Sequence, residues 1–247
     1  MRLILCCLFA GCLLAACTTP GPTPSDAANS PATAESFEAP RSEEVDFRIR
    51  DEHSNKLDAG ATVRIENPWG DIRVRKSDRR GVVEITMASQ RIGPDWPGQP
   101  ELRMDQSPTE FSVTTAFPGG RVTGDGRNAR IDLMVMVPAG HTMEFRTRDG
   151  AIKAKKTIGS VAARSDSGSI KIINDGPIRA SSESGQLQVR PMYPGWGELA
   201  LSSATGKVVA FLPDPANLQI EIGLIADVHS DWPLKHVASG YRLEAVP

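Results

Sequence analysis

The sequence predicts an all-β protein in which an N-terminal strand-rich region continues into a β-solenoid, a coil of stacked strands. Two observations support this prediction. A short phrase recurs around glycines that lie 17 to 21 residues apart, listed here in order: Gly150, Gly168, Gly185, Gly206 and Gly223. Apolar and polar residues also alternate along the chain after residue 40, where no amphipathic helix of ten residues or more is evident. Fixed spacing is typical of stacked units, and alternation is typical of strands with one buried face.

Each copy of the phrase places its residue types at the same distances from the glycine. Around Gly168, the apolar residues Ile170 and Ile172 follow at two and four positions, and Ser165 precedes by three. We expect the apolar residues to point into a core and the hydroxyl to bond backbone groups of the turn. We expect the glycine to supply a positive φ at a tight turn. An antiparallel meander with regular turns is the alternative architecture.

Residues 1–16 have the pattern of a targeting segment. Arg2 is followed by an apolar run from Leu3 to Ala16, which is too short to span a bilayer as a helix. The run ends in Leu14-Ala-Ala-Cys17, which resembles the lipobox of bacterial lipoproteins. The resemblance implies that Cys17 carries the lipid and that the protein is a palmitoylated lipoprotein bound to the membrane. Thr18 at the next position favours the outer membrane of a Gram-negative cell over retention in the inner membrane, with the face of that membrane left open.

The remaining chain divides into three predicted regions. Residues 17–40 are rich in Pro, Ala, Ser and Thr, so they are expected to form a disordered tether after the lipidated cysteine. Residues 41–140 form the strand-rich half, in which Gly70-Asp-Ile72-Arg-Val74 already repeats the later phrase. Residues 141–247 form the solenoid half. Because every cysteine of the chain lies at or before Cys17, no disulfide is expected after it.

Several of these motifs together resemble the putative adhesin family of bacterial envelope proteins, β-solenoid domains without an assigned activity. They are Val137-Pro-Ala-Gly140 before Phe145-Arg-Thr147, the spaced glycines, and Val209-Ala-Phe-Leu-Pro213. The resemblance covers roughly residues 60–235, and it implies a fold and a surface location but no catalytic residue.

The sequence contains none of the common catalytic or nucleotide-binding motifs. A metal pair made by His229, Asp231 and His236 is conceivable, although solvated turn histidines explain these residues more simply. We therefore predict no enzyme activity, metal or cofactor, and no nucleic-acid partner, with a glycan-active β-helix enzyme as a distant alternative.

Two surface features suggest a ligand. Residues 141–190 hold nine Lys and Arg against five Asp and Glu. The outward positions that form the expected anionic-ligand face are Lys153, Lys155, Arg164, Lys171, Arg179 and Arg190. Stacking would align them in rows that attract an anionic glycan or lipid such as lipopolysaccharide, or they form a solvated face. Tyr193 and Trp196, in the insertion that lengthens one repeat, either stack on a sugar ring or cover a gap in the coil.

The sequence therefore predicts an envelope-anchored lipoprotein with a non-catalytic, adhesin-like domain that acts in adhesion, scaffolding or protein interaction. A binding module for an anionic glycan or lipid is the alternative function.

Overall fold

The structure, a computed structural model, describes residues 3–6, 47–91, 100–117, 129–193, 197–213, 221–222, 227–230, 234–237 and 240–243. These residues form β-strands and the turns that join them, and none of them is helical. The prediction of an all-β protein is confirmed for this part of the chain. It also contains no helix with the length and apolar character needed to cross a bilayer.

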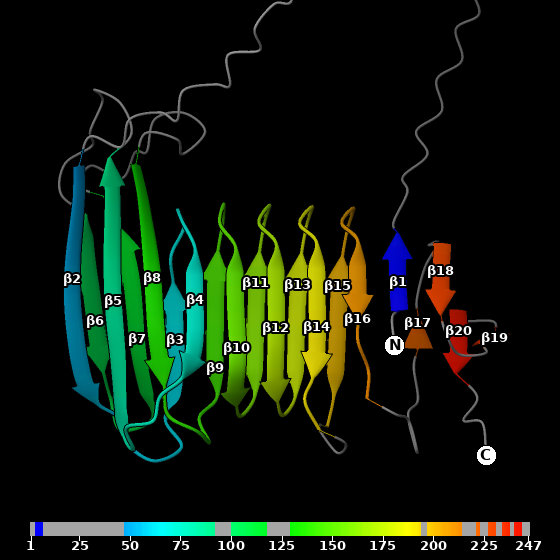
Figure 1. Cartoon of the computed structure of the whole chain (residues 1–247), viewed down its shortest axis with the longest axis horizontal. Helices are drawn as coiled ribbons and strands as arrows, with labels where there is room; N and C mark the ends of the chain where they lie inside the picture. Colours follow the sequence, from blue (N-terminus) through cyan, green and yellow to red (C-terminus); the bar gives the residue numbers. More distant parts are fainter. Residues whose placement is uncertain are drawn as a thin grey trace, which may run out of the picture.

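The strands form two large sheets and one small sheet (Figure 1). In spatial order, the ten-stranded sheet contains β18 (Asp227–Ser230), β1 (Leu3–Cys6), β16 (Val208–Ala210), β14 (Leu187–Pro191), β12 (Ile170–Asp175), β10 (Ile152–Ile158), β4 (Ile72–Lys76), β8 (Ala129–Val137), β5 (Val82–Arg91) and β2 (Phe47–Lys56). The seven-stranded sheet contains β15 (Leu199–Ser203), β13 (Ile178–Ser182), β11 (Val161–Ser165), β9 (Met143–Thr147), β3 (Thr62–Glu66), β7 (Glu110–Ala116) and β6 (Glu101–Gln106). The small sheet contains β17 (Glu221–Ile222), β20 (Gly240–Leu243) and β19 (Leu234–Val237).

Consecutive strands from β9 to β16 alternate between the two large sheets. From β9 to β14, each strand pairs in parallel with the strand two positions later, so that Ile152 lies opposite Ile170 and Ile170 lies opposite Leu187. These three apolar side chains are fully buried, and one continuous core takes residues from both sheets. The prediction that the apolar residues after each glycine point into the core is confirmed at these positions.

The glycines of the phrase stack into a column made by Gly70, Gly150, Gly168, Gly185 and Gly206. A Cβ atom on Gly168 would lie 1.7 Å from the carbonyl oxygen of Gly150, and Gly150 has the same relation to Gly70 at 1.9 Å. Within the column only Gly70 has a positive φ, of 126°. The prediction that Gly150, Gly168, Gly185 and Gly206 supply a positive φ is wrong, because these positions need glycine for close backbone approach. Gly223 lies outside the described residues.

The hydroxyl side chains before the column have the predicted partners. Ser165 Oγ accepts a hydrogen bond from the Gly168 N–H at 2.8 Å. The same bond forms between Ser182 and Gly185, again at 2.8 Å. These bonds fix the turn that brings each glycine against the previous one.

Both large sheets run across the predicted boundary between the N-terminal and C-terminal halves. Strand β3 pairs in parallel with β9, and β4 pairs in parallel with β10. Strands β3 and β4 therefore belong to the same stack as the later repeats, and β5 to β8 are inserted between the first and second pairs of the stack.

Strand β1 lies in the segment predicted to be a signal peptide. Leu3–Cys6 pairs antiparallel with β16 on one side and with β18 on the other. This placement describes the uncleaved chain, since cleavage before Cys17 would remove β1. Cys17 and the predicted tether lie outside the described residues.

Candidate anion-binding surface

Four parallel strands of the ten-stranded sheet carry two outward rows of side chains. Strands β4, β10, β12 and β14 are in register, and their outward residues alternate with buried apolar ones. The first row runs through Arg73, Lys153, Lys171 and Gln188. The second row runs through Arg75, Lys155, Ile173 and Arg190. Neighbouring members of a row are one strand spacing apart, about 4.8 Å.

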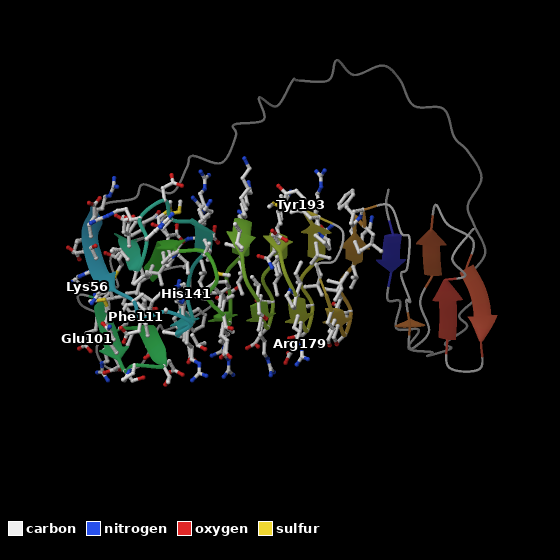
Figure 2. The ribbon with its side chains drawn as sticks, turned by 90° about the horizontal axis from the view of Figure 1, so that it is seen from below. Lys56, Glu101, Phe111, His141, Arg179 and Tyr193 are labelled. Atoms are coloured by element: carbon white, nitrogen blue, oxygen red, sulfur yellow. The ribbon has the colours of Figure 1, made fainter. Side chains whose placement is uncertain are left out.

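The structure separates the six predicted ligand-face residues into two groups. Lys153, Lys155, Lys171 and Arg190 lie together on the ten-stranded sheet, but Arg164 and Arg179 lie on the seven-stranded sheet. Figure 2 shows Arg179 and Tyr193 on opposite sides of the ribbon. Alternation distinguishes inward from outward positions but not one sheet from the other, so the single predicted face is two faces.

On the seven-stranded sheet, several cations form ion pairs with acidic neighbours. Arg64 is 3.0 Å from Glu144 and 3.4 Å from Glu110. Arg179 is 2.9 Å from Glu198. These exposed pairs add little stability, but they cancel much of the positive charge of this face.

The first outward row of the ten-stranded sheet is also compensated, through the buried carboxylate of Asp71. Its oxygens lie 2.8 Å from Arg130 and 3.1 Å from Arg73. Lys153 lies 3.8 Å away, and the Ala151 N–H donates a hydrogen bond of 3.0 Å. Two cations of the first row are therefore neutralised by one acidic group.

The environment of Asp71 lowers the pKa of its carboxyl below the ordinary value of 3.8. Burial by itself raises this pKa, but the Ala151 N–H and the charge of Arg130 lower it. The hydrogen bond from Arg73 and the charge of Lys153 act in the same direction. Because the folded pKa is depressed, Asp71 stabilises the fold above the unfolded pKa, and this stability is lost as the pH falls through the folded pKa.

We expect Asp71→Asn to lower the free energy of unfolding at pH 7 by about 2 kcal/mol, since charge-assisted bonds are replaced by neutral ones. Urea unfolding between pH 7 and pH 2 measures this loss. The difference from wild type should shrink as the pH falls through the folded pKa of Asp71, because its carboxyl then becomes protonated. The exposed Asp58 is a matched control, and Asp58→Asn should change stability little. A difference between wild type and Asp71→Asn that does not depend on pH would contradict the role of the charge.

The second outward row faces a hollow of about 940 Å³, which we call the basic hollow. The cations that line it are Arg75, Lys76, Lys155, Lys156 and Arg190. Within the described part of the chain, none of these five side chains has a hydrogen bond or an ion pair. Asp78 is the acidic residue of the lining. The basic hollow thus has a large excess of positive charge.

A β-bulge in β10 increases this charge. The pairing of β10 with β12 shifts register between Lys155 and Thr157, so Lys156 has no opposite residue. Lys155 and Lys156 are consequently both exposed, although neighbours on a regular strand point to opposite faces. The φ of Lys156 is 57°, and it is the one positive value for a non-glycine residue in the described chain.

The apolar part of the lining lies next to the cations. Ile173 occupies the middle of the second row, and Met192 and Tyr193 follow the end of β14. Tyr193 is 57% exposed, so its ring does not cover a gap in the core. Trp196, the second aromatic residue of the insertion, lies outside the described residues.

Sequence reasoning missed Arg75, Lys76 and Lys156. Arg75 follows Gly70 by five positions, as Lys155 follows Gly150 and Arg190 follows Gly185, so alignment on the glycines would have found it. For Lys156 the signal was the longer distance between Gly150 and Gly168, which contains the extra residue of the bulge.

Metal binding has no support among the described side chains. They contain no group of three or more His, Cys, Asp or Glu residues that could hold an ion. The conceivable pair from His229, Asp231 and His236 lies outside the described side chains.

No protein-family model and no curated protein sequence matches the chain. Two solved structures are similar to it. A putative cell adhesion protein from Clostridium sporogenes is 12% identical, with a TM-score of 0.40, and the match covers 66% of this chain and 98% of that one. A putative adhesin from Bacteroides fragilis is 8% identical, with a TM-score of 0.22, and the match covers 66% of this chain and 96% of that one. These comparisons do not assign the chain to a family.

Proposed function

We propose that this chain is an envelope lipoprotein, anchored through Cys17 in the outer membrane of a Gram-negative cell, whose β-solenoid is a non-catalytic, adhesin-like binding domain. Stacked parallel strands hold outward side chains in fixed rows, and such surfaces suit attachment to an extended partner. The observation that carries the proposal is the contrast between the two faces. On one face Arg64 and Arg179 are paired with acidic residues, whereas on the other face Arg75, Lys155 and Arg190 gather around one hollow without partners among the described residues.

The proposed anchor sets the distance at which this domain works. A flexible tether over residues 17–40 would have an average end-to-end distance of about 25 to 30 Å. Lipid chains on Cys17 would hold the protein at the membrane, since two or more acyl chains give stable anchoring. The tether would then keep the binding face clear of the lipid headgroups while limiting its reach.

A second candidate function is favoured by the basic hollow itself. Its unpaired cations are suited to an anionic glycan or lipid and less suited to an uncharged protein surface. In this alternative the chain is a binding module for such a ligand, and adhesion would follow from ligand binding.

We expect Cys17→Ser to abolish acylation and to release the domain from the membrane or leave an unprocessed precursor. Incorporation of a labelled palmitate analogue, together with detergent phase partitioning, measures this change. Cys12→Ser is the matched control, since Cys12 lies inside the predicted signal segment and should not carry lipid. If Cys17→Ser still takes up label and partitions as wild type does, the proposed anchor is refuted.

A further inference from the structure

The basic hollow brings together charge, an apolar strip and a backbone irregularity at one place on the sheet. We infer that it binds an anionic saccharide, a sugar chain that carries at least two phosphate or carboxylate groups. This inference rests on the proposed function and names the ligand class of the exposed cationic face.

The spacing of the cations sets the length of the ligand. Arg75 and Arg190 stand at the two ends of the second row, on β4 and β14. Three strand spacings separate them, about 14 Å. Side chains that extend straight out from the strands keep this separation, so a ligand that uses the whole row needs anionic groups at two or more positions.

The chemistry of the cations suits phosphate and carboxylate groups. Arginine can bond two oxygens of such a group at once, and lysine supplies a compact positive charge. Because the five cations of the basic hollow have no partners among the described residues, a ligand would not have to displace an ion pair. The paired cations Arg73 and Arg179 lack this advantage.

The centre of the row favours a sugar over a simple polyanion. Ile173 interrupts the cations between Lys155 and Arg190, and Tyr193 lies in the same lining. Exposed tyrosine offers a rigid apolar ring with a polar end at low entropic cost. A pyranose ring presents an apolar C–H face and polar edges, which complement this surface.

The bulge is a further sign that the basic hollow is a built site. A left-handed conformation costs a non-glycine residue roughly 1 to 2 kcal/mol. Strain of this kind concentrates at functional sites, where it places a side chain that regular structure would not. Here it adds Lys156 to the exposed face beside Lys155.

Titration calorimetry on the full chain in detergent tests the inference with four probes. The first probe is deacylated lipopolysaccharide, a phosphorylated oligosaccharide, and the second is the same oligosaccharide after phosphate removal. The third is intact lipopolysaccharide dispersed in the same detergent, and the fourth is inorganic pyrophosphate. We expect the first probe to bind, with an affinity that falls steeply as salt is added, and the second not to bind. Pyrophosphate should bind much more weakly, because it is too short to span the row.

Variants locate the site. Lys155→Gln/Arg190→Gln should weaken binding of the phosphorylated oligosaccharide by about tenfold or more, the effect of losing one charge-assisted hydrogen bond or more. Arg146→Gln/Arg164→Gln is the matched control, because it removes the same charge from exposed positions on strands of the seven-stranded sheet. It should leave the affinity within about twofold of wild type. Tyr193→Ala should weaken binding of the phosphorylated oligosaccharide several-fold and leave binding of pyrophosphate unchanged.

Lys156→Gly separates ligand binding from folding. Glycine tolerates the left-handed conformation, so the melting temperature should stay the same or rise. Affinity for the phosphorylated oligosaccharide should nevertheless fall several-fold. An unchanged affinity in this variant would show that the bulge is only a structural feature.

The outcomes also separate this inference from the proposed function. If the two double variants lose affinity equally, the site is not the basic hollow. If pyrophosphate binds as tightly as the oligosaccharide, the site recognises charge alone and the inference fails. If only intact lipopolysaccharide binds, the ligand is its lipid part, which overturns the saccharide assignment. Suppose that no probe binds, but that Cys17 is acylated and a defined protein crosslinks to the domain in intact cells. The inference then fails and the proposed function stands.

Discussion

Gly168→Ala is expected to destabilise the protein by about 3 kcal/mol or more, which is severe for the addition of one methyl group. The new Cβ would lie 1.7 Å from the carbonyl oxygen of Gly150 and 2.4 Å from its carbon. Both obstacles are backbone atoms, so no side-chain rotation can relieve the clash. The two turns would have to separate, which would weaken the bond of 2.8 Å between the Gly168 N–H and Ser165 Oγ. A melting temperature about 10 °C below wild type would correspond to this loss.

Gly140→Ala is the matched control for this prediction. Gly140 has a φ of 88°, but a Cβ there would meet no atom within 4 Å. Its substitution should cost only the left-handed strain of about 1 kcal/mol. Equal losses in the two variants would mean that conformational strain, and not close approach, explains the glycine column.

Deletion of one whole repeat, from Ser169 through Gly185, should lower the free energy of unfolding far less than the introduction of one charged side chain into the core. The deletion takes out β12 and β13, one strand from each large sheet, and joins Gly168 to Gln186. Strand β10 can then pair with β14 in the register that β12 had, with Ile152 opposite Leu187. In stacked architectures stability is approximately a sum over neighbouring units, so the shortened protein should still unfold cooperatively.

Ile170→Asp should have the opposite result. Ile170 is fully buried between Ile152 and Leu187, so the substitution places an unpaired carboxylate in the core. We expect a loss of roughly 4 kcal/mol, measured by urea unfolding at pH 7. Lys171→Asp, at the adjacent outward position of β12, should change stability by less than about 1 kcal/mol.

A deletion that is one residue shorter, from Ser169 through Ser184, sharpens the test of stacking. It shifts the following strand by one position, so apolar side chains would face outward. This variant should be much less stable than the full-repeat deletion. If both deletions unfold the protein while Ile170→Asp leaves it folded, the stacked arrangement is refuted.

The sequence predicted the local features of the fold because those features repeat. Residues two positions after the glycines, such as Ile72, Ile152 and Ile170, lie opposite one another as their phase indicates. The serine before Gly168 bonds the turn for the reason that its residue type suggested. Alternation and turn chemistry involve residues close in sequence, so one chain was enough to find them.

Features that depend on distant neighbours could not be predicted in the same way. The conformation of Gly168 follows from the position of Gly150 in the preceding turn, which the sequence does not report. Arg179 looked equivalent to Lys171, yet the two lie on different sheets. The sequence also does not show whether a cation is paired. Arg73 forms an ion pair with Asp71 in the preceding turn, whereas Arg75 has no partner among the described residues.

The insertion of β5 to β8 between the first two strand pairs of the stack has a consequence for the order in which the protein assembles. Later pairs join residues about 17 positions apart, as in the bond between Thr157 and Asn174. Docking of β3 on β9 instead joins residues 80 positions apart, as Arg64 and Glu144 show. Closing the longer loop costs about 1.4 kcal/mol more entropy, which would slow that contact about tenfold. We therefore expect nucleation among β9 to β14, with β3 and β4 added late, so that the Arg75 end of the basic hollow is completed only in the last steps of folding.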